Sequence, residues 1–210
     1  NRITGGTISG PGLIQCGSGQ ALTGHGTIST DVQFLGGSRL LAKGGTLEIS
    51  GTMNGLGAQI GAADAAGVLN VTKAWNTGIV GELFLNGGHV TGGAITNDGI
   101  THGHGTITTS GFDNNSKLTA NGGTLTINTT AFADLDGSTE TGEINAINGS
   151  VHVMGNYGGL FVHDGSVTIG VGQQYSMDNH GLAITDELVL AGGTYAAPGF
   201  SIYSVAALTV

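Results

Sequence analysis

Short runs in which every second residue is apolar recur along this chain, and most of them are bounded by glycine. Residues 45–49, 123–127 and 165–169 are examples, with Leu, Val or Ile alternating with Thr, Ser or Glu. In a β-strand this alternation puts the apolar side chains on one face and the polar side chains on the other. The runs recur at fairly regular intervals, and a period of about 20 residues is typical of one turn of a parallel β-helix.

A longer repeat is superimposed on this short period. Three pairs of segments match in the same order and at a nearly constant offset, which drifts by one position from each pair to the next. The pairs are 24–30 with 103–109, 38–47 with 116–125, and 81–91 with 158–168. Each copy of the long repeat therefore corresponds to about four turns.

The composition agrees with a glycine-rich folded repeat. Of the 210 residues 42 are Gly and only 2 are Pro, and the three-residue period of collagen is missing. The chain is 39% hydrophobic and only 9% charged, whereas a disordered chain combines low hydrophobicity with high net charge. Glycine and asparagine permit the backbone conformations needed at the corner of each coil.

We therefore predict an all-β fold, a right-handed single-stranded parallel β-helix (β-solenoid) of about ten coils, each of about 20 residues. At about 4.8 Å per coil the rod would be about 50 Å long. Residues 1–210 form a single domain. Its parts are two internal repeats at approximately residues 22–100 and 101–178, with partial terminal coils at residues 1–21 and 179–210.

Two irregular segments interrupt the predicted coils. Residues 55–67 are rich in Ala and Gly, and residues 130–143 are acidic and rich in Thr and Ser. We expect both to be larger loops on one side of the rod. The interior of a narrow coil has room mainly for aliphatic side chains, so we expect Trp75 and the Phe residues at wider turns or under loops.

The charge distribution excludes two classes of partner. Fourteen acidic residues against five Lys and Arg give a net charge of −9, and no basic residue follows Lys117. Nucleic acids and anionic lipid surfaces both require clustered basic residues. No segment has the roughly 18 consecutive apolar residues of a membrane-spanning helix. We expect no nucleic-acid partner and no membrane insertion.

A cluster of carboxylates lies at Asp134, Asp136, Glu140 and Glu143. Two carboxylates about 5 to 10 Å apart can hydrolyse a glycoside, and Asp134 and Asp136 also offer hard oxygen ligands for calcium. The complete calcium-loop patterns are missing, and a solvated loop is the simpler interpretation. We keep Asp134 and Asp136 as candidate metal ligands.

Two histidines form the other candidate metal site. His102 and His104 are two positions apart, so on a strand their side chains would face the same way and could share a metal ion. His89 lies about one coil earlier, and no third ligand is identifiable. Surface or corner positions are the alternative for these histidines.

Other chemistry has little support in the sequence. The chain has no nucleophile elbow, phosphate loop or dinucleotide fingerprint, so we expect no enzymatic activity and no resident cofactor. Thr106 and Thr108 have the Thr-x-Thr spacing of an ice-binding face, but Glu48 and Asn70 interrupt that pattern in other coils. The single cysteine, Cys16, cannot form an internal disulfide. We expect it to be buried, with an intermolecular bridge or a reactive thiol as alternatives.

Four phrases carry a resemblance to known proteins. They are GHGTIST (24–30), AKGGTLEISG (42–51), LNGGHVTGGAITNDG (85–99) and ANGGTLTIN (120–128). They resemble the degenerate Gly/Asn/Thr repeats of bacterial cell-surface β-solenoids, namely autotransporter passengers, filamentous-haemagglutinin-like adhesins and related secreted repeat proteins. The likeness covers approximately residues 3–195. It implies an extracellular or cell-surface location and a structural or adhesive role, and it carries over no catalytic residue.

The functional hypothesis is a self-associating subunit of a surface filament, fibre or sheath, or an adhesin rod. An exposed end of a β-helix is an open sheet edge that must be capped or paired, so we expect end-to-end stacking into a homopolymer. The residues predicted to make this contact are Ile3, Ile8, Leu13, Phe200, Ile202, Tyr203, Val205, Leu208 and Val210. The alternative is a carbohydrate-binding or polysaccharide-cleaving β-helix, with host or matrix glycans as partners.

Overall fold

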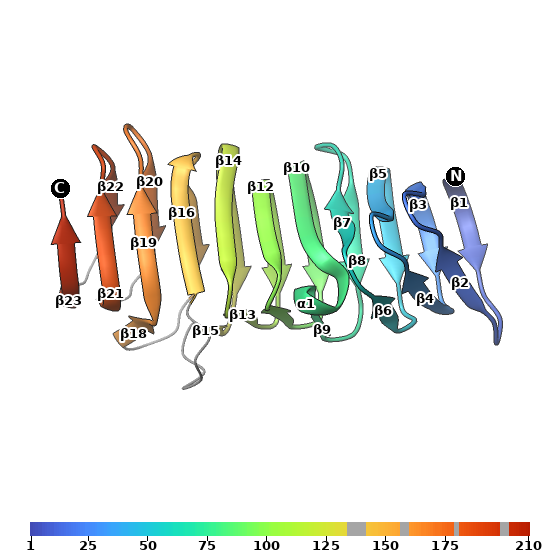
Figure 1. The fold of residues 1–210 in the computed structure, drawn as a ribbon. Helices are drawn as coiled ribbons and strands as arrows, with labels where there is room; N and C mark the ends of the chain where they lie inside the picture. Colours follow the sequence, from blue (N-terminus) through green and yellow to red (C-terminus); the bar gives the residue numbers. More distant parts are fainter. Residues whose placement is uncertain (134–141, 156–159, 179–180, 198–201) are drawn as a thin grey trace.

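The computed structural model confirms the all-β prediction, because the chain forms a parallel β-solenoid of about nine turns with 69% of its residues in strands. It describes residues 1–133, 142–155, 160–178, 181–197 and 202–210. The coils stack along one axis, from strand β1 (Arg2–Ile8) at one end to strand β23 (Ile202–Thr209) at the other (Figure 1).

The strands form three parallel sheets. The largest sheet contains β1, β3 (Ala21–Ile28), β5 (Arg39–Ile49), β7 (Ala58–Ala62), β8 (Val68–Val71), β10 (Gly81–Gly92), β12 (Ile100–Thr109), β14 (Lys117–Thr129), β16 (Gly142–Asn148), β17 (Val151–Met154), β18 (Leu160–His163), β19 (Gly165–Ile169), β20 (Gln174–Met177), β21 (Gly181–Leu190), β22 (Thr194–Ala196) and β23. A second sheet contains β9 (Trp75–Asn76), β11 (Ile95–Asn97), β13 (Phe112–Asn114) and β15 (Phe132–Ala133). The third contains β2 (Leu13–Cys16), β4 (Asp31–Phe34) and β6 (Met53–Gly55). A short helix, α1 (Thr77–Val80), follows β9.

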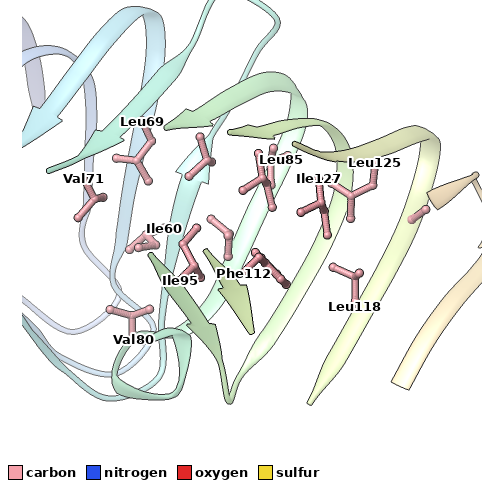
Figure 2. Close-up of a cluster of buried hydrophobic side chains, with 14 of the residues drawn as sticks. Ile60, Leu69, Val71, Val80, Leu85, Ile95, Phe112, Leu118, Leu125 and Ile127 are labelled. Atoms are coloured by element: carbon pink, nitrogen blue, oxygen red, sulfur yellow. The ribbon is translucent and has the colours of Figure 1, made fainter. Parts of the chain in front are cut away.

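One column of the ladder runs from β3 to β23 and sets the turn length. Its members, each paired with the next, are Leu22, Leu40, Ile60, Leu83, Thr101, Leu118, Ile144, Val167, Leu188 and Leu208. The turns that they define are unequal: the shortest runs from Thr101 to Leu118, and the longest from Leu118 to Ile144. The inner members of the column, from Leu40 to Leu188, are at most 1% exposed, so the column is part of the core. Figure 2 shows Ile60 and Leu118 pointing into the interior together with Leu85, Leu125 and Ile127.

Two of the three long-repeat matches are structurally equivalent in their first halves. Gly24 and Gly103 lie in one column of the ladder and are four turns apart. Leu40 and Leu118 are also four turns apart in their column. The second halves of the same matches are displaced, because four turns beyond Leu47 lies Ile127 and not its sequence match Leu125.

The third match is not structurally equivalent. Four turns beyond Leu83 in the ladder lies Val167, and not the residue that matches Leu83 in sequence. That residue, Leu160, lies in β18 and pairs with Gly181 instead. The turns between them differ in length, so similar sequences fall at different places in the ladder. The division into two four-turn units stays a prediction.

The prediction of a loop over residues 55–67 is wrong, since this segment contains strand β7, whose residues Ala58, Ile60 and Ala62 are buried. Small alternating residues fit the narrow interior as well as larger ones do. Residues 134–141 of the other predicted loop lie outside the described part of the chain.

The expected position of the aromatic residues is also wrong for three phenylalanines, one of which is Phe132. Phe34 and Phe112 are only 1% exposed and belong to the core. Phe112 stacks on Phe132 of the next turn, with ring centroids 5.9 Å apart. Phe34 lies against Gly55 of the next turn, where a Cβ would be only 2.7 Å from that of Phe34. Gly55 therefore lets its turn approach the backbone of Phe34 closely.

Candidate functional site

A row of side chains that are polar except for Ile100 crosses the outer side of the large sheet, and we call it the outer polar row. Strands β5, β7, β10, β12, β14 and β16 contribute one position each in this row. By register the positions are Arg39, Gln59, Glu82, Ile100, Lys117 and Glu143. A neighbouring row on the same face contains Phe84, His102, Thr119 and Asn145.

Glu82 is the centre of the hydrogen bonding in this row. Its Oε1 accepts a hydrogen bond from Nε2 of Gln59 at 2.9 Å and is also in contact with Nε2 of His102. The ring of Phe84 lies 5.2 Å from the ring of His102. The His102 and Glu82 side chains are 26% and 33% exposed, so the pair is held in place and is still accessible to a ligand.

A second polar pair lies two turns further along. Nζ of Lys117 is 3.3 Å from a carboxylate oxygen of Glu143, and Nδ2 of Asn145 donates to Oε1 of Glu143 at 2.5 Å. Because the Lys117 and Glu143 side chains are 45% and 41% exposed, this ion pair stabilises the fold by less than about 1 kcal/mol.

A shallow trough of about 330 Å³ borders the outer polar row and runs along the solenoid axis. It is lined by Gly37, Ser38, Arg39, Gly57, Ala58, Gln59, Gly81, Glu82 and Ile100. The three glycines come from successive turns and have no side chain to fill the space. The trough therefore crosses four turns, a length of about 15 Å, and its wall combines an arginine, an amide and a carboxylate.

The groups on this surface are of the kinds that form hydrogen bonds with polar ligands. Arg39 and Gln59 offer donors, and Glu82 and His102 offer a charged acceptor beside a titratable ring. A His–Glu pair can also relay a proton. Among the described residues, His102 makes its one side-chain hydrogen bond to Glu82.

The two histidines predicted as a metal site do not come together. His102 contacts Glu82 in the preceding turn, whereas His104 lies against Gly122 and Gly123 of the following turn. Nδ1 of His104 is 3.2 Å from the carbonyl oxygen of Asn121. Gly103, between the two histidines, has a φ of 113°, and the pairing register shifts between Gly103 and Gly105.

Other predicted ligands give no metal site in the described part of the chain. No three His, Cys, Asp or Glu side chains there are grouped so that they could hold a metal ion. Asp134 and Asp136 lie outside the described residues. Cys16 is buried as predicted, and burial raises the pKa of its thiol.

The residues predicted for end contacts divide into three groups. Ile8, Leu13, Leu208 and Val210 are 39%, 55%, 59% and 92% exposed. Ile3 is buried, and Val205 packs against the core. Ile202 and Tyr203 lie in β23, and Phe200 lies outside the described residues.

Sequence reasoning missed Gln59 and Glu82, although a signal was present. The separation of Glu82 from His102 along the chain is one turn of the predicted repeat. Applying the period to polar residues as well as to apolar ones would have placed them side by side.

Comparison of this chain with protein-family models, curated proteins and solved structures gives no match. The fold alone therefore assigns this protein to a class, that of the β-solenoids. Within the described residues, the helices are too short to cross a membrane.

Proposed function

We propose that this protein is a structural β-solenoid of the cell exterior and that its end coils extend the stack by pairing with further copies of the chain. The observation that carries this proposal is the open strand edge at each end. Among the described residues, β1 pairs with β3 alone and β23 pairs with β21 alone. Unpaired edges of parallel strands are templates for adding another strand.

The exposed apolar residues near these edges support the same contact. Ile8 and Leu13 belong to the first two strands, and Leu208 and Val210 lie at or beside the last one. The two ends carry different residues, so one end would pair with the opposite end of a second copy. Such a head-to-tail contact does not close on itself and builds an open filament.

The net charge of −9 opposes this association, because two negatively charged rods repel each other. Salt screens that repulsion. The proposal therefore requires association to strengthen, not weaken, as the salt concentration rises.

Sedimentation velocity over a range of protein concentrations, with negative-stain microscopy, tests the proposal. We expect rods that lengthen with protein concentration and with salt. Ile8→Lys and Leu208→Lys each place a positive charge at one end of the chain and should shorten the rods. Leu56→Lys is the matched control, since Leu56 is 75% exposed on the side of the rod. Monodisperse single rods at every concentration, or equal shortening by the control, would overturn end-to-end pairing.

The location at the cell exterior needs a separate test. Protease treatment of intact cells that produce the protein should degrade it if it lies on the surface, while a cytoplasmic marker stays whole. Protection of the protein until the cells are lysed would contradict an exterior role.

A second candidate function is binding of a linear carbohydrate, and the trough beside the outer polar row favours it. A polysaccharide could lie along the four turns with its hydroxyl groups toward Arg39, Gln59 and Glu82. Glycan-array binding, with Glu82→Gln and Gln59→Ala as variants and Glu187→Gln as an off-site control, tests it. Binding that these two variants leave unchanged would exclude the trough.

A further inference from the structure

A crevice opens on the side of the solenoid where two sheets fail to join. β6 pairs with β4, and β9 pairs with β11, but these strands belong to separate sheets. The helix α1 follows β9 directly and packs against β6 and β10. Figure 1 shows α1 beside β9 at this edge of the coil stack. The interruption of the ladder leaves a crevice of about 130 Å³.

The floor of the crevice is apolar and contains the single tryptophan of the chain. Met53, Val71 and Val80 line it and are at most 7% exposed, and Trp75 is half-buried beside them. Val71 and Val80 point into the interior in Figure 2. An enclosed apolar cavity of about 150 Å³ holds benzene, and this crevice is slightly smaller, so it has room for about one six-membered ring and no more. A ring placed beside an indole gains offset or edge-to-face aromatic contact.

The rim of the crevice is polar and has a positive charge. Thr52, Asn54 and Lys73 line it and are exposed. Lys73 is one of only five basic residues in a chain of net charge −9. Among the described residues it forms no ion pair, whereas Lys117 pairs with Glu143. A carboxylate on a bound ring would supply the missing partner.

We propose that this crevice binds a small aromatic carboxylate, with the ring against Trp75 and the carboxylate at Lys73. The apolar floor selects the ring, the volume limits it to about one ring, and the lysine selects the anion. The proposal is independent of end-to-end assembly, because the crevice lies on the side of the rod, in the turns that contain β6 and β9.

Titration followed by ¹H–¹⁵N NMR tests the proposal on the intact chain, with benzoate as the probe. A single tryptophan gives a single indole N–H resonance, which reports directly on Trp75. Benzyl alcohol is the neutral comparison, because it has the ring without the negative charge. We expect both compounds to shift the indole resonance to saturation, and raised salt to weaken only benzoate binding.

Two lysine variants make the test specific. Lys73→Gln should weaken benzoate binding by roughly three- to fivefold, the usual effect of an exposed ion pair, and leave benzyl alcohol binding unchanged. Lys43→Gln removes a different exposed lysine and should leave both affinities unchanged. No saturable shift of the indole resonance, unchanged benzoate affinity in Lys73→Gln, or equal weakening in Lys43→Gln would each overturn the proposal.

Discussion

The ring of His104 lies against Gly123 in the next turn of the solenoid, where a methyl group on Gly123 would come within 3.2 Å of His104 Cβ. The other copy of the long repeat has the same contact, since a Cβ on Gly45 would lie 3.1 Å from that of His25. His25 and His104 occupy matching Gly-His-Gly motifs in the two copies. The long repeat therefore preserves a packing contact in which a histidine covers a glycine corner.

Replacing Gly123 by alanine tests this contact. Gly123 has no positive φ, so alanine meets crowding by the ring and no backbone strain. We expect Gly123→Ala to lower the free energy of unfolding by about 1 to 2 kcal/mol. In a double-mutant cycle with His104→Gly, measured by chemical denaturation, the coupling should be about 0.5 to 1 kcal/mol. Additive effects would show that the two residues do not press on each other.

Gly103→Ala should destabilise the fold much more than alanine does at a glycine that has free space around its Cβ position. Gly103 has a φ of 113°, and a Cβ there would lie 1.9 Å from the carbonyl oxygen of Leu85. We expect Gly103→Ala to lower the free energy of unfolding by at least about 3 kcal/mol, because backbone strain and steric overlap act together. Gly36→Ala is the matched control, because nothing lies within 4 Å of a Cβ there. Similar unfolding midpoints for the two variants would contradict the close approach of the turns.

A buried asparagine connects three turns and should be sensitive to truncation. Oδ1 of Asn97 accepts hydrogen bonds from the hydroxyls of Thr77 at 2.9 Å and Thr101 at 2.7 Å, and its Nδ2 donates to Oδ1 of Asn114 at 2.7 Å. All four side chains are fully buried. Asn97→Ala removes a hydrogen-bond partner from several buried polar groups. It should lower the free energy of unfolding by about 3 kcal/mol.

The exposed Asn128 provides the control for that substitution. Asn128→Ala should change the free energy of unfolding by less than about 0.5 kcal/mol. If calorimetry gave both alanine variants the same melting temperature as the unmodified protein, the buried network would not contribute to stability.

The buried histidine His163 should make stability depend on pH. Burial lowers its pKa to about 4, although the carbonyl oxygen of Ser166 and the charge of Asp164 act in the opposite direction. In the unfolded chain a histidine takes up its proton near pH 6.5. Between pH 6.5 and about pH 4 the unfolded state therefore binds the proton more tightly, and this group's contribution to stability falls by about 3 kcal/mol. Above pH 6.5 the contribution is complete.

Denaturant unfolding of the protein and of His163→Gln, each at pH 7 and near pH 4.5, measures this effect as a difference between the two proteins. The variant should lose less stability on acidification than the unmodified protein does. His89→Gln, at an exposed position, should behave like the unmodified protein. Parallel pH profiles for the protein and His163→Gln would contradict the assignment.

The architecture of this protein follows from the pattern of its amino acids. Alternation of apolar residues, glycine at the corners and a period of about 20 residues are sufficient for a β-solenoid, because one coil buries its apolar face only by stacking on its neighbours. The long repeat correctly related His25 to His104 and Leu40 to Leu118. These are local and repetitive signals, so they are readable without knowledge of distant contacts.

Which side chains of neighbouring turns contact each other depends on the tertiary structure. Turn lengths vary along the core column, most sharply on either side of Leu118, and this variation puts Leu160 at a different place in the ladder from Leu83, its match in sequence. The meeting of Glu82 with His102, the burial of Phe34 against Gly55 and the crevice beside Trp75 all depend on that register. The length of each turn and the position of each bulge set which residues of neighbouring turns lie opposite each other. Local alternation of apolar residues does not give this register by itself.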